Sequence, residues 1–283
     1  MISVIGLGSC GCNIASKFAQ YPQYRTFYID TEVDLKGKHT FRFPKFNSPE
    51  EYEEKCPEMS DFFHDVDDEV IFIVGGSGYI SASSLRVLSY VRDKKITIVY
   101  VKPEVDFLSE INRLMENSTF HIFQEYARSG VFERVLILEN PTLEKIIPDL
   151  TIGNFFQKIN EFAVYAMHMV NVFDNTKPVM SNFSDLKETS RISSLGMVDL
   201  ESGEEKMFFS IDNVTEKRYY FGVNSENLNK DAELLNKIKK HIKANKDNVI
   251  TSFAIYPTSY SHDLAYVVSY SSQIQTKNIT PDE

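Results

Sequence analysis

Residues 4–18 constrain the fold more than any other part of the sequence. They read Val-Ile-Gly-Leu-Gly-Ser-Cys-Gly-Cys-Asn-Ile-Ala-Ser-Lys-Phe: an apolar run, a glycine-rich turn and then a helical pattern. Glycines let the backbone approach a phosphate closely, and the first turn of a helix presents unpaired N–H groups at the positive end of its dipole. A strand, a glycine-rich turn and a helix in this order therefore predict an anion-binding site.

The composition is that of a globular protein: of 283 residues, 42% are hydrophobic and 25% are charged. This length corresponds to one large or two modest domains. No apolar run approaches the roughly 18 residues of a membrane-spanning helix, so we expect no membrane insertion. The net charge of −10 argues against direct binding of nucleic acid. Two of the three cysteines lie in the glycine-rich turn, which does not suggest a disulfide framework, and we expect a cytoplasmic protein.

Strand and helix patterns alternate over the first 150 residues. Continuous apolar runs indicate strands that are covered on both faces, as in a parallel sheet. After the first strand, the predicted strands are 26–29, 70–74, 96–101 and 135–138, and the predicted helices are 49–64, 80–92 and 105–129, the last broken near 117–118. This alternation predicts an α/β fold with a doubly wound, mostly parallel sheet.

The pattern changes in the second half of the chain. Residues 154–173 form a long helical pattern that is apolar nearly all round, which indicates a buried central helix. Beyond it, strands over 206–211, 218–223, 249–255 and 265–270 and an amphipathic helix over 227–243 predict a smaller α+β domain with a mixed sheet. We therefore expect a nucleotide-binding domain over residues 1–173, a smaller domain over 174–275 and a tail over 276–283.

Ligands of doubly wound sheets bind at the carboxyl ends of the strands. The first glycine turn, Asp30, the second turn Gly75-Gly76-Ser77-Gly78, Lys102 and Asn140 all follow predicted strands. Two glycine turns on one sheet are suited to holding both ends of a polyphosphate, although each alone also serves as a tight crossover turn.

A dinucleotide site is a second interpretation of the first turn. Gly6-Leu7-Gly8-Ser9-Cys10-Gly11 matches the G-x-G-x-x-G pattern, and Asp30 follows at the end of the second strand, where a ribose-binding acid lies in NAD sites. This motif is weak by itself, and it does not account for the second glycine turn or for the buried central helix.

The order of the motifs resembles the tubulin/FtsZ superfamily of polymerising GTPases over about residues 1–190. Residues 6–13 have the spacing of the first phosphate loop of FtsZ, and residues 75–79 fall where the glycine-rich signature loop lies. The further matches are Asp30-Thr31-Glu32 (second loop), Val101-Lys102-Pro103 (after the fifth strand), Glu139-Asn140-Pro141 (after the sixth), Phe156 and Asn160 (the residues facing guanine), and residues 182–186 (the loop after the central helix).

The resemblance implies a GTP or GDP site with Mg²⁺ held largely through water and phosphate oxygens. It assigns no protein ligand to the metal. The nucleotide-binding residues that it implies are Gly8, Ser9, Cys10, Gly11, Cys12, Asn13, Asp30, Thr31, Gly75, Gly76, Ser77, Gly78, Tyr79, Lys102, Glu139, Asn140, Phe156 and Asn160.

The resemblance also implies a head-to-tail homopolymer in which each subunit completes the site of its neighbour. Asp185 occupies the second acidic position of the catalytic loop and is expected to orient the attacking water, whereas Asn182 replaces the first acid. One carboxylate in place of two implies weak hydrolysis. A homologue that binds nucleotide without hydrolysing it and an NAD(P)-dependent enzyme remain the alternatives, and no adaptor protein is identified.

Overall fold

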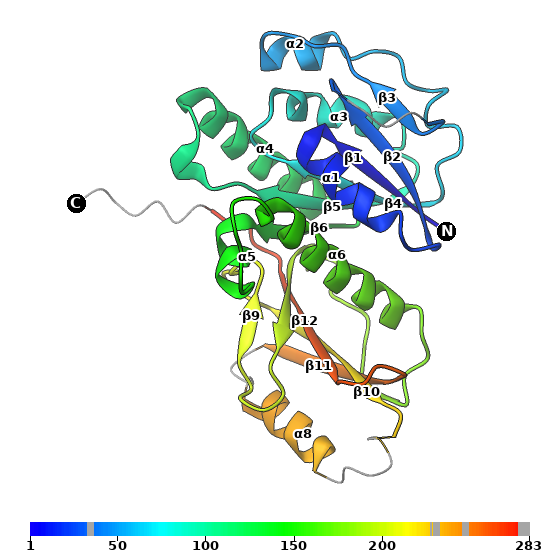
Figure 1. The fold of residues 1–283 in the computed structure, drawn as a ribbon, viewed down its shortest axis with the longest axis vertical. Helices are drawn as coiled ribbons and strands as arrows, with labels where there is room; N and C mark the ends of the chain where they lie inside the picture. Colours follow the sequence, from blue (N-terminus) through cyan, green and yellow to red (C-terminus); the bar gives the residue numbers. More distant parts are fainter. Residues whose placement is uncertain (33–36, 227, 229–232, 245–248, 277–283) are drawn as a thin grey trace, which may run out of the picture.

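The computed structural model describes residues 1–32, 37–226, 228, 233–244 and 249–276 (Figure 1). Its strands join into one 12-stranded sheet in the order β3-β2-β1-β4-β5-β6-β8-β12-β10-β11-β7, with β9 paired to β8. The strands are β1 Ile2–Leu7, β2 Tyr24–Asp30, β3 Thr40–Arg42, β4 Glu69–Gly75, β5 Lys95–Lys102, β6 Arg134–Glu139, β7 Met180–Ser181, β8 Ile192–Val198, β9 Glu205–Met207, β10 Glu216–Asn224, β11 Ile250–Thr258 and β12 Leu264–Ser271.

The first six strands form a wholly parallel sheet, as predicted. Helices α1, α5 and α6 pack on one face, and α2, α3 and α4 pack on the other. These helices cover the parallel strands on both faces, which explains why the strands are continuous apolar runs without polar alternation. The helices are α1 Gly8–Phe18, α2 Pro49–Glu54, α3 Ser84–Ser89, α4 Glu110–Arg128, α5 Asn140–Ile146, α6 Phe155–Asp174 and α8 Leu234–Ala244, with 3-10 turns η1 Tyr79–Ser83 and η2 Val105–Phe107.

Helix α6 lies between the parallel part of the sheet and the C-terminal strands (Figure 1). It is the longest helix of the described residues, and most of its apolar side chains are buried, as predicted. None of the helices described is long and apolar enough to cross a membrane.

The C-terminal strands form the predicted mixed arrangement. Strand β12 pairs antiparallel with β8 and β10, while β10 and β11 are parallel. Helix α8 packs against these strands around Tyr219, Ile238 and Val267. The predicted second sheet is continuous with the first, because β6 pairs with β8 through Val135 and Leu136. The domain boundaries near residues 173 and 275 remain predictions, and residues 277–283 of the predicted tail lie outside the described residues.

Several predicted helices are shorter in the structure. Helix α2 ends at Glu54 rather than near residue 64, because Pro57 disfavours helical backbone at the residue before it. The predicted helix 80–92 is η1 followed by the short α3. There the hydroxyls of Ser81 and Ser83 donate to the carbonyls of Gly78 (2.6 Å) and Ile80 (2.7 Å), bonds that compete with regular helix formation.

Two other elements also differ from the prediction. Helix α4 runs without a break through residues 117–118. The strand predicted over 206–211 is limited to β9, and the helix predicted over 227–243 is described mainly as α8 because residues 227 and 229–232 lie outside the described part.

We expect Phe173→Ala to destabilise the fold more than any exposed substitution on α6. Phe173 is 2% exposed, and its ring stacks on Tyr256 at a centroid distance of 4.6 Å. Truncating such a ring costs about 3–5 kcal/mol. Phe156→Ala, on the same helix but 64% exposed, is the matched control and should change the free energy of unfolding by less than about 0.5 kcal/mol. Equal effects in denaturant unfolding would contradict the central position of α6.

Candidate functional site

A pocket of about 800 Å³ lies at the carboxyl edge of the parallel strands. Both glycine turns, the end of β5, the loop after it, α5 and the first turns of α6 contribute to its walls. Of the residues predicted to contact a nucleotide, those that line it are Ser9, Cys10, Asn13, Gly75, Ser77, Asn140, Phe156 and Asn160. The fold thus brings together residues from four motifs that are far apart in the sequence.

The first glycine turn packs backbone against backbone. A Cβ on Gly6 would lie 2.4 Å from the Gly11 carbonyl oxygen, and one on Gly11 would lie 2.3 Å from the Ile73 oxygen. Gly8 has a φ of +70°, which favours glycine. No side chain caps α1 at Leu7, so the amides of its first turn are available to an anion.

Cys10 and Cys12 are packing residues of this turn. The Cys12 thiol donates to the carbonyls of Gly6 (3.4 Å) and Ile29 (3.6 Å). A Cβ on Gly75 would lie 3.2 Å from the Cys10 Cβ, so the two glycine turns touch at this cysteine. Burial raises the pKa of both thiols to about 12, which keeps them protonated near neutral pH. The described residues contain no group of three or more His, Cys, Asp or Glu side chains that could hold a metal ion.

The second glycine turn rests on a buried polar cluster. A Cβ on Gly76 would lie 1.7 Å from the Tyr100 hydroxyl oxygen. That hydroxyl donates to the Glu116 carbonyl at 3.1 Å, and the Lys102 Nζ lies 3.9 Å from a Glu116 carboxylate oxygen. Lys102 is only 6% exposed and does not line the pocket. The structure places this predicted nucleotide contact behind the turn, among Glu116 and the ring of Phe120.

Other predicted contacts also brace the pocket without lining it. Asp30 is 7% exposed and accepts hydrogen bonds from the Ser9 hydroxyl and the Thr31 amide, both at 2.8 Å. Glu139 accepts a hydrogen bond from the Thr142 hydroxyl at 2.5 Å. The predicted contacts that do not line the pocket are Gly8, Gly11, Cys12, Asp30, Thr31, Gly76, Gly78, Tyr79, Lys102 and Glu139.

The far wall of the pocket comes from the start of α6. Asn160 is 8% exposed, whereas Phe156, one turn earlier, is 64% exposed. Two further apolar residues at the mouth, Phe107 and Ile152, are 83% and 102% exposed and were not predicted from the sequence. The signal for them is an apolar side chain in a loop that directly follows a strand-end or helix-end motif.

Asn182 and Asp185 lie near the opposite end of α6, a helix of roughly 30 Å at 1.5 Å per residue. Asn182 pairs with β11: its amide donates to the Phe253 carbonyl (3.0 Å), and its side-chain oxygen accepts from the Phe253 amide (2.6 Å). Asp185 is exposed. Residues 182–187 form no helix. Strand β7 pairs with β11 directly before them, and Asn182 extends this pairing. Within one chain, these two residues do not meet the pocket.

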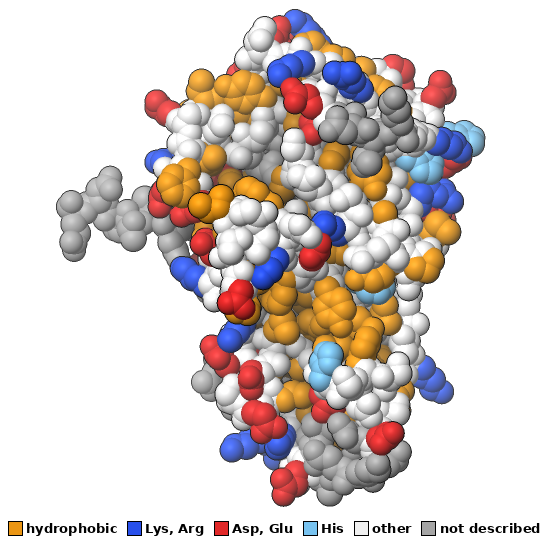
Figure 2. Space-filling view, in the orientation of Figure 1, with side chains coloured by type: hydrophobic (Ala, Val, Ile, Leu, Met, Phe, Trp, Pro, Cys, Tyr) orange, Lys and Arg blue, Asp and Glu red, His pale blue; other side chains and the backbone are white. Residues whose placement is uncertain are grey.

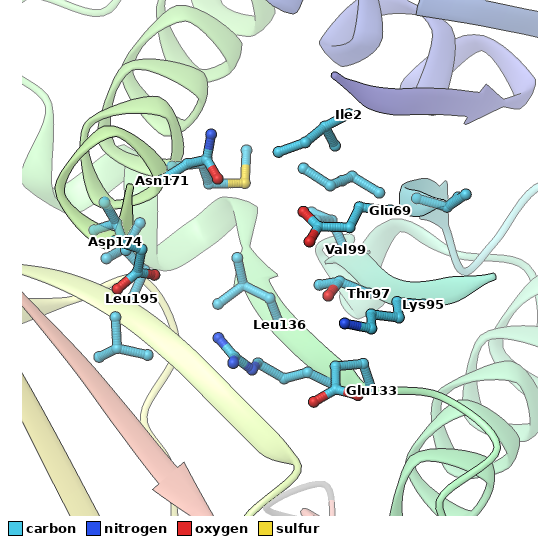
Figure 3. A pocket seen from close by; sticks show the side chains of 16 residues that line it. Ile2, Glu69, Lys95, Thr97, Val99, Glu133, Leu136, Asn171, Asp174 and Leu195 are labelled. Atoms are coloured by element: carbon cyan, nitrogen blue, oxygen red, sulfur yellow. The ribbon is translucent and has the colours of Figure 1, made fainter. Parts of the chain in front are cut away.

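A smaller cavity of about 370 Å³ lies at the amino ends of the parallel strands (Figure 3). Ile2, Glu69 and Thr97 face the C-terminal half of α6 across it. Asp174 lines the α6 side, and its carboxylate accepts a hydrogen bond from the Tyr220 hydroxyl at 2.9 Å. None of the predicted nucleotide contacts lines this cavity.

No protein-family model and no curated protein matches the sequence. Solved structures do match. TubZ of Bacillus thuringiensis serovar israelensis, in a GTPγS-form protofilament, is 16% identical, with a TM-score of 0.72 over 95% of this chain and 86% of that chain. FtsZ of M. jannaschii is 13% identical, with a TM-score of 0.70 over 96% and 88% of the two chains. CetZ2 of Haloferax volcanii, in a GTPγS-bound protofilament, is 12% identical, with a TM-score of 0.69 over 95% and 92%. The chain therefore has the tubulin/FtsZ-like fold, which the order of its motifs predicted.

We expect Gly76→Ala to strain the second glycine turn, because its new methyl group overlaps the Tyr100 hydroxyl. Overpacking of this kind costs about 1–3 kcal/mol. Gly153→Ala is the matched control, since a Cβ there meets nothing within 4 Å. Tyr100→Phe in the Gly76→Ala background should recover part of the loss in denaturant unfolding. If Gly76→Ala and Gly153→Ala have the same free energy of unfolding, the second glycine turn does not pack against Tyr100.

Proposed function

We propose that this protein binds GTP or GDP in the 800 Å³ pocket and assembles head to tail into filaments. The observation that carries the proposal is the meeting of both glycine turns, Asn140 and the start of α6 around one cavity. The likeness in fold to TubZ and CetZ2, both solved as protofilaments with GTPγS, supports the same conclusion.

The two glycine turns supply the phosphate site. They approach each other at Cys10 and Gly75, so a single polyphosphate spans both sets of amides. Burial keeps the Cys10 thiol neutral, and it adds no negative charge beside the phosphates. Mg²⁺ would be held by phosphate oxygens and water, as is usual for nucleoside triphosphates.

The start of α6 supplies the base site. The exposed ring of Phe156 offers a stacking surface at the mouth, and the amide of Asn160 is able both to donate to and to accept from a guanine edge. The NAD alternative requires Asp30 to bind a ribose. Its carboxylate instead accepts hydrogen bonds from the Ser9 hydroxyl of the first turn and from the Thr31 amide, which favours the guanine nucleotide.

Exposed apolar residues at both ends of α6 support head-to-tail assembly. Phe107, Ile152 and Phe156 surround the pocket mouth, and Val179 and Met180 near the other end are 59% and 44% exposed. Contact between two unlike ends is heterologous, and it produces an open filament unless the rotation closes into a ring. Burying these side chains between subunits removes apolar surface from water.

Hydrolysis in this assembly depends on Asp185 of the neighbouring subunit. Its exposed carboxylate would orient the water that attacks the terminal phosphate. Asn182 carries no charge, and its side chain is hydrogen-bonded to β11, so only one carboxylate is provided. That observation also favours the second candidate function, a filament protein that binds the nucleotide without hydrolysing it.

We expect GTP and GDP to raise the melting temperature of the protein more than ATP or NAD does. A ligand at 100 times its Kd stabilises the folded state by about 2.7 kcal/mol. Asn160→Ala should weaken GTP binding by roughly tenfold or more, because the buried amide no longer recognises guanine. Gln157→Ala, which changes an exposed residue of the same helix turn, is the control and should bind normally. A shift with NAD but none with GTP would support the dinucleotide interpretation instead.

We expect Asp185→Ala to pellet with GTP like the wild type while releasing phosphate at least about tenfold more slowly, because the water is no longer oriented. Ser184→Ala, at the adjacent exposed position, is the control. Mixing the Asp185→Ala and Asn160→Ala proteins provides the sharper test. In a mixed filament, an Asn160→Ala subunit supplies its Asp185 to the GTP of an Asp185→Ala neighbour, so phosphate release should recover above either protein alone.

Three outcomes would contradict parts of this account. No GTP-dependent pelleting at concentrations well above micromolar would rule out the filament. Pelleting without phosphate release by the wild type would favour the candidate that lacks hydrolysis. Mixed filaments without recovery would show that the carboxylate does not act between subunits.

A further inference from the structure

Helix α4 exposes an apolar stripe along its outer face. Its inner face packs on the sheet through Phe120, Phe123 and Ala127, which are fully buried or nearly so. On the opposite side, Ile111 and Leu114 are 54% and 63% exposed, and Ile122 and Tyr126 are each 40% exposed. Hydrophobic side chains gather on the surface in Figure 2 where α4 lies in Figure 1. Contiguous exposed apolar surface of this kind marks an interaction site.

The centre of the stripe is symmetric about Ser118. Leu114 and Ile122 lie four residues to either side of this serine; towards the ends of the helix, Ile111 has Glu125 as its counterpart and Tyr126 has Glu110. At 3.6 residues per turn, all of these positions fall on one face. A helix that crosses a second copy of itself in the opposite direction therefore places Leu114 against Ile122 of the other copy and Ser118 against Ser118. The small serine at the centre allows the two helices to approach closely.

The polar residues beside the stripe match in the same arrangement. Glu110 and Arg128 are 18 residues apart, which is five helical turns, so they lie on the same flank of α4. Both are exposed. When the helix is reversed about Ser118, Glu110 of one copy comes beside Arg128 of the other, and Asn117 comes beside His121. Arg128, which lies 3.6 Å from the Glu125 carboxylate of its own helix, then has a second carboxylate beside it at each end of the helix pair.

We propose that α4 is a docking surface for a second copy of this chain, in an antiparallel helix pair about a two-fold axis at Ser118. The contact is isologous, because each copy contributes the same residues. It is distinct from the head-to-tail contact, since it uses neither the pocket nor Asp185. The area that one helix pair buries is small for a stable dimer, so the contact is weak between single molecules. It becomes strong where many copies are already aligned, because each further contact is then intramolecular.

Disulfide trapping at the symmetry centre tests this geometry. Ser118→Cys in the full-length protein places two thiols across the two-fold axis within the Cα separation that a disulfide requires. We expect at least tenfold more cross-linked dimer than from Ser89→Cys, an exposed serine on α3, under the same mild oxidation. The wild type, with its half-buried cysteines Cys10, Cys12 and Cys56, is the background control. The trapping should occur with or without GTP, so its failure is independent of the proposed nucleotide function.

Two further variants test the contacts. Ile122→Glu in the Ser118→Cys protein should lower the dimer yield at least tenfold with unchanged circular dichroism. Glu110→Arg or Arg128→Glu alone should lower it several-fold, and the double variant, which exchanges the two charges, should restore it. Failure of the double variant to recover would show that these residues do not face each other.

The maleimide reactivity of the thiol at position 118 distinguishes docking of a second copy from covering of the stripe by the chain itself. We expect this thiol to react quickly with a maleimide in dilute protein and slowly in concentrated protein. Protection at every dilution would show that the chain itself covers the stripe, and that result would overturn the proposal. A dimer yield no higher than that of Ser89→Cys, even at high concentration, would overturn it as well.

Discussion

Direct backbone contact between β1, α1 and β4 holds the centre of this molecule together. It depends on Gly6 and Gly11, where any side chain would overlap the Gly11 or Ile73 carbonyl oxygen. Because the strand and the helix touch without intervening side chains, α1 begins directly at the edge of the sheet. Its uncapped first turn then faces the second glycine turn across Cys10. The pocket is a consequence of this packing, since both of its glycine-turn walls are fixed by it.

The parts of the fold that the sequence predicted are those with strong local signals. Continuous apolar runs identified the parallel strands, and the nearly uniform apolar character of residues 155–174 identified the central helix. The order of the glycine turns and of Phe156 and Asn160 led to the tubulin/FtsZ-like fold, although no sequence comparison finds a relative. The structure confirms these predictions because each motif or element depends on residues that are close together in the chain.

The differences arise where a distant partner decides the conformation. Lys102 ends β5, at the edge where ligands bind, but its side chain lies in the interior beside Glu116 of α4. Asn182 extends the pairing of the edge strand β7 because Phe253, 71 residues later, exchanges two hydrogen bonds with it. The exposed apolar residues Phe107 and Ile152 carry only a weak local signal, since an apolar side chain in a loop is equally suited to a core. Burial and pairing of this kind are set by tertiary structure.

The order of the strands has a consequence for how the chain folds during synthesis. Strand β1 lies between β2 and β4, and its residue Ile2 aligns with Glu69 of β4. The ribosome therefore releases the central strand well before one of its two neighbours exists. Until β4 emerges, one edge of β1 has no strand to pair with, and non-local parallel pairing of this sort forms slowly. A nascent chain of this protein therefore passes through a stage in which an apolar strand edge is unpaired, and species of this kind are prone to aggregate.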